Sequence, residues 1–408
     1  MSFRCDDVAE PPKQDEFMVD QMSVRQRLVA ALDCQQPDRV PCSFMIFHIL
    51  RKTCASEQEL ARRQLEMGLD PFVHLGHVPM CFDPAVTTSL AKQPDPDGAG
   101  TLLIKTYHTP AGDLQTVVRQ TEDWEHGDSV PLLDDFLIPR SNKFLITGPD
   151  DLPALRHLFA PFADDRIKTY RAQARELKAF AEKHALPTVG GWGRGGEPGV
   201  MGMDPVNWLV GMENLMLMAH DQPDTVDELA DIIAEWNLRQ IEIQLDPAPD
   251  VIFHRAWYET TEFWTPQQYQ RFIQPRLKRE ADLIHQAGSR LGYICTSAMM
   301  PLVPYIVDAG VDVLIGVDPV QGKGTDLPAL KQATAGQMAL WGGVSGAVTV
   351  ELGTAEQTFR AVREAIDALA PGGGFVLSPV DNVRDETPQS WPNVRAFIDA
   401  CRQYGRYA

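Results

Sequence analysis

The feature that most constrains the fold of this chain is a repeated alternation of short apolar runs with longer stretches of helical periodicity, most regular in the second half. Runs of this kind are typical of buried parallel strands, and the stretches between them are typical of crossover helices. Eight such runs occur, at residues 42–47, 71–75, 187–191, 251–253, 291–294, 313–316, 338–341 and 374–378. The pattern predicts a (β/α)8 TIM barrel, with an open doubly wound sheet as the alternative.

Two segments depart from this alternation. Residues 1–22 are polar and acidic without a hydrophobic period, so we expect a flexible leader, and Ser23 is placed to cap a helical extension that precedes the first strand. Residues 85–136 contain short alternating segments separated by turn residues, which predicts an antiparallel insertion. We therefore expect one barrel domain, residues 23–408, that carries this insertion.

Composition narrows the class of protein. With 408 residues, 44% of them hydrophobic, the chain can bury a large core. A net charge of -19 argues against nucleic acid or an anionic membrane as the main ligand and favours a small molecule or another protein. No apolar stretch is long enough for a membrane helix and no signal peptide is apparent, so we expect a cytoplasmic location. The seven cysteines contain no CxxC pair, which makes a disulfide framework unexpected.

In a barrel, the residues that follow the strands meet at one mouth, where chemistry is placed. Histidine, cysteine and carboxylate side chains from several strand ends could form a metal or acid/base site there, and aromatic side chains could hold a substrate. The candidates at these positions are His48, His77, Trp192, His254, Trp257, Tyr258, Glu259, Cys295, Asp381 and Asn382.

Each candidate also has a structural interpretation. A buried cysteine such as Cys295 is more often a packed thiol than a ligand, and His254, Glu259 or Asp381 could be caps or ion-pair residues. Trp257 and Tyr258 could belong to the core. The chain has no GxxxxGK[ST] segment, no dinucleotide fingerprint and no GxSxG elbow, which disfavours a phosphate-binding loop and a serine hydrolase.

Landmark stretches in order along nearly the whole chain resemble the uroporphyrinogen decarboxylase (URO-D) superfamily, which includes cobalamin-dependent methyltransferases. They lie at residues 25–32 with 37–41, 264–266 with 275–278, 309–312, 342–344 with 352–354, and 373–379. The resemblance implies a (β/α)8 barrel with its active site at the C-terminal mouth. True decarboxylases carry an RQAGRY-type segment after the first strand; residues 47–52 lack it, so the methyltransferase branch is the closer match.

In that branch, an HxC pair and a later cysteine hold a zinc ion. This chain keeps the cysteine as Cys295, but Tyr293 replaces the histidine and Asp381 stands at the later cysteine position. The preferred interpretation is a modified zinc site made by Cys295, Asp381, Glu259 and His254, which would act as a Lewis acid on a methoxy or methylthio donor. The methyl group would then pass to a corrinoid protein, because the chain has no DxHxxG segment of its own to bind cobalamin.

Two alternatives stay open. In one, no metal binds, and His254, Tyr258 and Asp381 transfer protons in a decarboxylase of a small or porphyrin-like carboxylated substrate. In the other, the barrel is non-catalytic and acts in a protein assembly. For either enzyme we expect the substrate to contact His48, His77, Trp192, Trp257 and Asn382. The family resemblance further implies a homodimer.

Overall fold

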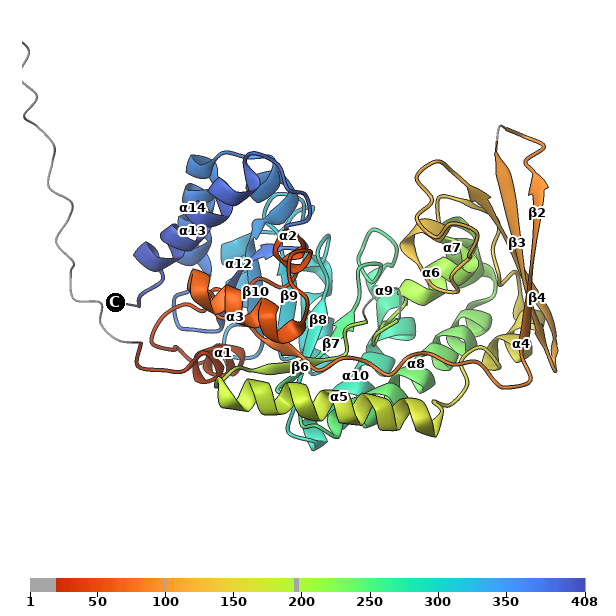
Figure 1. Ribbon diagram of the computed structural model, residues 1–408, viewed down its shortest axis with the longest axis horizontal. Helices are drawn as coiled ribbons and strands as arrows, with labels where there is room; N and C mark the ends of the chain where they lie inside the picture. The colour runs from red at the N-terminus through yellow and green to blue at the C-terminus, as the bar shows by residue number, and fades with distance from the viewer. Residues whose placement is uncertain (1–19, 99, 194–197, 408) are drawn as a thin grey trace, which may run out of the picture.

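The computed structural model describes residues 20–98, 100–193 and 198–407, and its centre is a parallel sheet of seven strands in the order β1-β6-β7-β8-β9-β10-β11 (Figure 1). Most of the predicted leader, residues 1–19, lies outside the described residues. The strands are β1 (Val73–His74), β6 (Thr188–Gly190), β7 (Val251–Arg255), β8 (Arg290–Ile294), β9 (Val313–Val317), β10 (Ala339–Ser345) and β11 (Phe375–Val380).

The predicted closed eight-stranded barrel is only partly confirmed. Residues 42–47, the first predicted strand, lie beside β11 through two isolated parallel bridges, Cys42 to Leu377 and Ile46 to Asn382. On their other side the carbonyl of Cys42 accepts a hydrogen bond from the amide of Asp70 (2.8 Å), and no described ladder joins them to β1. The fold is therefore barrel-like but not fully closed, because the eighth position is held by single bonds instead of a ladder.

Large side chains fill the space enclosed by the strands. Phe72, Phe253 and Trp341 contact one another edge-to-face, with ring centroids 5.7 to 5.9 Å apart. Around them pack Met45, Ile294 and other inward-facing strand residues, so the interior is a core and not a pore. Helix α1 (Val24–Leu32) begins at a capping box on Ser23 and packs its apolar residues into the same cluster.

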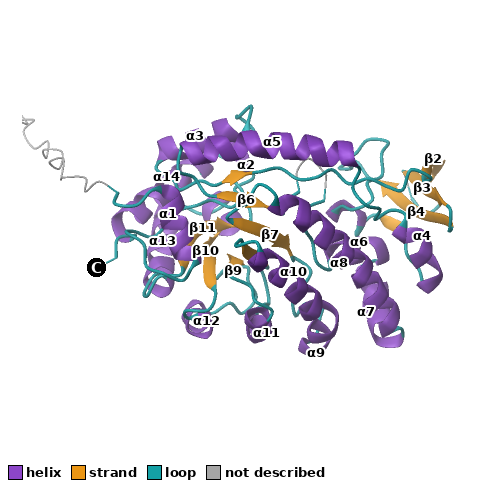
Figure 2. Ribbon diagram, turned by 90° about the horizontal axis from the view of Figure 1, so that it is seen from below, coloured by secondary structure: helices purple, strands orange, loops and turns teal. Residues whose placement is uncertain are grey.

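Helices lie around the parallel strands and toward the end of the molecule that carries the antiparallel insertion (Figure 2). In addition to α1 they are α2 (His48–Arg51), α3 (Glu57–Met67), α4 (Leu152–Arg156), α5 (Asp164–Lys183), α6 (Asp204–Val210), α7 (Met212–Asp221), α8 (Pro223–Leu245), α9 (Pro266–Gln268), α10 (Gln274–Gln286), α11 (Val303–Asp308), α12 (Leu327–Thr334), α13 (Ala355–Leu369) and α14 (Ser390–Tyr404). The periodicity predicts one helix over 204–220, but Gly211, at φ +82°, divides it into α6 and α7. A side chain at Gly211 would collide with the ring of Phe144.

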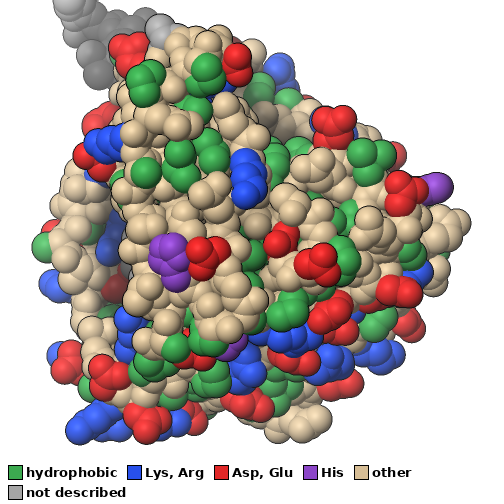
Figure 3. Space-filling model, turned by 90° about the vertical axis from the view of Figure 1, so that its right-hand side faces the viewer, with side chains coloured by type: hydrophobic (Ala, Val, Ile, Leu, Met, Phe, Trp, Pro, Cys, Tyr) green, Lys and Arg blue, Asp and Glu red, His purple; other side chains and the backbone are tan. Residues whose placement is uncertain are grey.

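The predicted antiparallel insertion is present as a four-stranded sheet, β2 (Thr87–Pro94), β3 (Thr101–Thr109), β4 (Gly112–Gln120) and β5 (Ser141–Lys143). It extends beyond the expected boundary at residue 136 to include β5. The sheet stands at one end of the molecule, where acidic and basic side chains are interspersed on the surface (Figures 1 and 3). Apolar residues of β3 and β4 belong to the same core cluster as the barrel helices.

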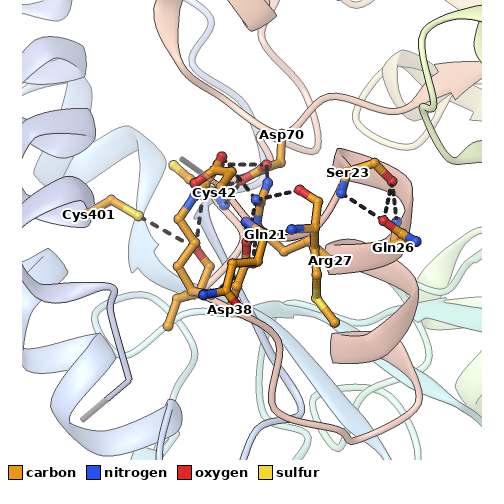
Figure 4. A network of polar contacts seen from close by, with 12 residues as sticks. Gln21, Ser23, Gln26, Arg27, Asp38, Cys42, Asp70 and Cys401 are labelled. Atoms are coloured by element: carbon orange, nitrogen blue, oxygen red, sulfur yellow. Dashed lines mark hydrogen bonds and ion pairs between the residues drawn. The ribbon is translucent and has the colours of Figure 1, made fainter. Parts of the chain in front are cut away.

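A buried ion-pair network fixes α1 and the chain that leads into residues 42–47 (Figure 4). Arg27 donates to Asp38 (2.7 Å) and to Asp70 (2.6 Å), and Arg39 donates to the second oxygen of Asp70 (2.7 Å). Asp38 also accepts the amides of Gln21 and Met22, so the last residues of the predicted leader are attached to the fold. Although burial opposes ionisation, Arg27 and the amide of Met22 lower the pKa of Asp38 to about 2.

In the part of the chain that the structure describes, no helix combines the length and apolar character needed to span a bilayer.

Candidate active site

The C-terminal ends of the parallel strands surround two cavities that share Trp192 and Gly193 as a common wall. The larger, which we name the His48 cavity, has a volume of about 350 Å³. The smaller, the Trp208 cavity, has a volume of about 160 Å³ and reaches from Trp192 to Trp208 and Arg255. Trp192 was predicted to contact substrate, and its position between both cavities is compatible with that role.

The His48 cavity joins an apolar floor to a polar side. Met45, Phe72 and Phe253, which belong to the barrel core, form its floor, and Ile46, Phe47, Leu60, Trp192 and Gly193 complete its apolar walls. The polar lining comes from His48, Arg51 and His74. Such a lining, mostly apolar with a few placed polar groups, is typical of a small-molecule site.

Arg255, at the end of β7, is the centre of a charged and aromatic cluster at the Trp208 cavity. Its guanidinium lies over the rings of Trp257 (4.2 Å) and Trp208 (4.7 Å) and donates to Asp135 (2.7 Å). The other oxygen of Asp135 accepts the Tyr258 hydroxyl (2.8 Å) and the Trp208 indole N–H. Burial, with the negative charge of Asp135, raises the pKa of Tyr258, so this predicted catalytic hydroxyl keeps its proton and serves to hold Asp135.

Asp204 lies behind Arg255 and is fully buried. One oxygen accepts the amide of Tyr258 (2.8 Å), and the other lies 3.3 Å from Nε of Arg255. Burial raises the pKa of this carboxyl to about 7, because desolvation outweighs the attraction of Arg255. A carboxyl group that titrates near neutrality beside a mouth cavity is a functional-site candidate on physical grounds.

His254 does not point into the mouth. It lies on the outer face of β7 with its Nδ1 2.6 Å from Glu280 of α10, and its Nε2 lies 3.8 Å from Glu259. Although burial alone would lower the pKa of His254, Glu280 and Glu259 raise it to about 10, so the ring is a cation held between two carboxylates. Asn237 of α8 donates to the other oxygen of Glu280 (3.0 Å). Buried and paired in this way, His254 is part of a structural network.

Glu259 completes that network from the loop after β7. Its Oε1 accepts the amide of Met203 (2.7 Å), and its Oε2 accepts the hydroxyl of Tyr293. The hydroxyl of Tyr269 donates to Tyr293 in turn (3.2 Å). Gly202 is required here, because a Cβ atom at this position would stand 1.7 Å from Oε1 of Glu259. The carboxylate therefore binds the 202–203 loop to strand β8.

Cys295 directly follows β8 and is fully buried in the layer between the sheet and the outer helices. Its thiol is directed to the carbonyl of Ser297 at 3.9 Å. Burial, assisted by the negative charge of Glu259, raises the pKa of the thiol far above its usual range, which disfavours the thiolate that a metal requires.

Asp381 and Asn382 follow β11 at the mouth. Asp381 has a left-handed backbone (φ +65°), which is uncommon outside glycine and recurs at functional positions. Partial removal from water raises the pKa of its carboxyl, while Arg255 across the mouth and Arg384 nearby oppose the shift. The side-chain oxygen of Asn382 accepts the amide of His48 (3.3 Å), so this pair adjoins the His48 cavity.

The other two predicted substrate residues, Trp257 and His77, are not among the residues that line the two cavities. Trp257 stacks on Arg255 and meets Trp192 at 5.9 Å, which places it between the cavities, where it supports their walls. His77, in the loop after β1, is half-buried and lines neither cavity.

The predicted zinc ligands do not fit a zinc ion as the structure arranges them. The described residues hold no group of three or more His, Cys, Asp or Glu side chains suited to a metal. His254 and Glu259 meet, but Nδ1 of His254 is engaged by Glu280, and the two carboxylate oxygens of Glu259 are engaged by Met203 and Tyr293. Nε2 of His254 has no hydrogen-bond partner among the described residues. The carboxyl of Asp381 belongs to the mouth, while the thiol of Cys295 is buried in the outer layer.

Sequence reasoning missed Arg51, Asp135, Asp204, Arg255 and Glu280 as members of these clusters. Arg255 could have been found, because it follows His254 at a strand end and the alternation of side chains along a strand turns it to the opposite face. Asp135 and Glu280 carried no such signal, since they reach the clusters from an insertion and from a helix.

Comparison with known proteins gives one family. A model described as uroporphyrinogen decarboxylase (URO-D) matches residues 207–404. Among solved structures, the chain is similar to a methyltransferase from Methanosarcina mazei, with 19% sequence identity and a TM-score of 0.57, over 94% of this chain and 99% of that one. No curated protein sequence matches.

Two further structures are more distant. One is a B12-independent methionine synthase from Shewanella sp. W3-18-1, with 9% identity, a TM-score of 0.45, and coverage of 90% of this chain and 97% of that one. The other is a putative vitamin-B12 independent methionine synthase from Listeria monocytogenes, with 15% identity, a TM-score of 0.34, and coverage of 46% and 61%. At these identities the similarity concerns the fold. The family model thus matches residues 207–404, and over nearly its whole length the chain is similar in fold to the methyltransferase from Methanosarcina mazei.

Proposed function

We propose that this protein is a methyltransferase that takes a methyl group from a small methoxy or methylthio compound and passes it to a corrinoid carried by a partner protein. The observation that supports the proposal is the His48 cavity, where an aromatic floor and wall lie at the barrel mouth beside polar groups. Phe72, Phe253 and Trp192 would hold the apolar body of the donor. The reaction class is taken from the superfamily.

Demethylation of an ether breaks the bond between the methyl carbon and oxygen and leaves the electron pair on oxygen. That oxygen needs a proton, and the candidate donor is Asp381, which directly follows β11 at the mouth, next to Asn382, whose side chain accepts the amide of His48. The partner's corrinoid would supply the methyl acceptor. No step is assigned to zinc, since the described residues hold no group of three or more His, Cys, Asp or Glu side chains suited to a metal.

The test is methyl transfer to free cob(I)alamin, which stands in for the partner. Purified protein is mixed with methoxyaromatic and methylthio donors, and formation of methylcobalamin is followed by absorbance. We expect a donor-dependent rate that Asp381→Asn lowers about 100-fold without a change in donor affinity. Asp367→Asn, an exposed carboxyl of α13, is the matched control. Donors that bind in calorimetry yet never yield methylcobalamin would overturn the proposal.

A second candidate, decarboxylation without a metal, is favoured by the same cavity, whose Arg51 and His48 suit a carboxylate. Here the carbon–carbon bond to the carboxylate breaks, carbon dioxide leaves, and the carbon takes a proton from Asp381. Release of labelled carbon dioxide from a carboxyl-labelled substrate in the absence of cobalamin would favour this reaction. Methylcobalamin formation with the carboxylate retained would favour methyl transfer.

A further inference from the structure

The charge of the His48 cavity is opposite to that of the chain. The protein has 56 acidic residues against 37 lysines and arginines, yet none of the described side chains that line this cavity is acidic. Its ionisable lining consists of Arg51, His48 and His74. A cation at the wall of a pocket in an otherwise acidic protein favours an anionic ligand over a neutral one.

Arg51 is positioned to bind such an anion. Its side chain is 39% exposed, and a single described ion pair engages it, from Nη1 to Glu57 at 3.5 Å. Glu57 also accepts the backbone amide of His74 (3.0 Å), which holds this carboxylate outside the lining of the cavity. A guanidinium offers five N–H donors in a planar fork that matches a carboxylate, so one long contact to Glu57 leaves donors for a ligand.

The two histidines add polar groups next to Arg51 in the cavity. Nδ1 of His74 accepts the amide of Gly76 (3.0 Å), so the proton of the neutral ring is on Nε2, which is a donor. His48 is half-buried, and besides burial the positive charges of Lys52 and Arg384 lower its pKa, while Asp385 opposes them. These lysine and arginine charges show that the rim near His48 is basic. An anion in the cavity would meet attraction from both the wall and the rim.

We infer that the His48 cavity takes an aromatic monocarboxylate, with its ring on Phe72, Phe253 and Trp192 and its carboxylate on Arg51 beside His48. The cavity volume of about 350 Å³ lies in the range of small-molecule sites and suits a substituted benzoate. This inference names the substrate class of the proposed methyltransferase and so rests on that function for its catalytic meaning. The binding of the monocarboxylate itself is inferred from the cavity alone and does not depend on that function.

The test compares two ligands of the same shape, 4-methoxybenzoate and 4-methoxybenzamide, which differ in charge. Isothermal calorimetry is done with the full-length protein and without cobalamin, so the result does not depend on turnover. We expect the benzoate to bind at least about tenfold more tightly than the benzamide, because a charge-assisted hydrogen bond contributes more than a neutral one.

Arg51→Gln should weaken the benzoate about tenfold and leave the benzamide within about twofold. Arg62→Gln, an exposed arginine on the neighbouring helix α3, is the matched control and should change neither. Arg51→Lys keeps the charge and should therefore retain part of the preference for the benzoate. This result would show that the effect of Arg51→Gln comes from the lost charge and not from misfolding. Equal binding of the two ligands, absence of benzoate binding, or an equal effect of both glutamine variants would overturn the inference.

The outcome separates the two proposals. Benzoate binding through Arg51 without methyl transfer would retain this inference and remove the methyltransferase. Methyl transfer from neutral donors alone would retain the methyltransferase and remove this inference.

Discussion

At the scale of single residues, Asp204 is the group whose ionisation the fold alters most consequentially near neutral pH. Its carboxyl is buried behind Arg255, and its pKa rises from 3.8 to about 7. Between these two values the folded protein holds a proton that the unfolded chain releases. The contribution of Asp204 to the stability of the folded state must therefore decrease as the pH rises through this interval and level off above it.

Replacing Asp204 by asparagine removes this titration. We expect the free energy of unfolding of the wild type to fall by about 2 to 3 kcal/mol relative to Asp204→Asn between pH 5 and pH 8. Urea unfolding of both proteins at several pH values measures the difference. Asp282→Asn, at an exposed position on α10, should run parallel to the wild type. Parallel curves for Asp204→Asn as well would contradict the assignment.

For Cys295 we expect a structural role and no part in ligand or metal binding. Because its thiol is buried in the outer layer and away from the cavities, Cys295→Ala should leave ligand affinity and the metal content of the purified protein unchanged. It should lower the free energy of unfolding by about 1 to 2 kcal/mol through lost packing. Elemental analysis and calorimetry check both points. A zinc ion that is present in the wild type and lost in the variant would restore the predicted metal site.

The sequence identified Cys295 by position but could not show which way it faces. Inward and outward residues alternate along a strand, and on β8 Gly292 and Ile294 face the interior while Tyr293 lies on the outer side. A one-residue difference reverses this assignment. Since both faces of a barrel strand are apolar, no polar alternation reveals the phase. His254 and Cys295 were therefore assigned to the mouth, although both face outward.

At the scale of elements, α1 is joined to the rest of the fold by its buried arginine. Arg27→Ala would leave Asp70, which is fully buried, without its 2.6 Å partner, although Arg39 would still bind it. We expect a loss of about 3 to 5 kcal/mol in the free energy of unfolding, because an uncompensated buried charge is costly. Arg25→Ala on the same helix removes a pair whose arginine is 53% exposed and should cost about 1 kcal/mol or less.

Chemical denaturation of the two variants side by side measures this difference. Equal losses would show that α1 is held by its apolar face alone.

Most elements were predictable because hydrophobic periodicity and turn residues are local signals. The seven strands of the parallel ladder correspond to seven predicted apolar runs, and the capping box at Ser23 begins α1 as expected. The division at Gly211 and the incomplete pairing of residues 42–47 were not predictable. They depend on Phe144 and on strand neighbours that are distant in sequence.

At the scale of the whole molecule, the antiparallel sheet and the barrel share one hydrophobic cluster. Leu103 and Tyr107 of β3 and Val118 of β4 belong to the same set of buried residues as Leu291 and Leu340 of the parallel sheet. A core that is continuous across both parts predicts that they unfold together.

We expect a single transition in urea by far-ultraviolet circular dichroism and by tryptophan fluorescence. Leu103→Ala should shift both curves equally, by about 2 to 4 kcal/mol. The comparison tests whether the antiparallel insertion unfolds independently of the barrel. Two separated transitions, with only the first shifted by Leu103→Ala, would show that the insertion is a separate folding unit.

Residues 42–47 hold the eighth position of the barrel through isolated bridges, and Met45 to Phe47 form part of the wall of the His48 cavity. We call residues 42–47 the seam. Its backbone amides exchange with deuterium through small local openings, whereas the amides of β7 to β10 need larger openings. A ligand in the cavity would bind only the closed seam and slow that exchange. The seam is thus a reporter of occupancy, and its deuterium uptake would show which compounds enter the cavity before any reaction is known.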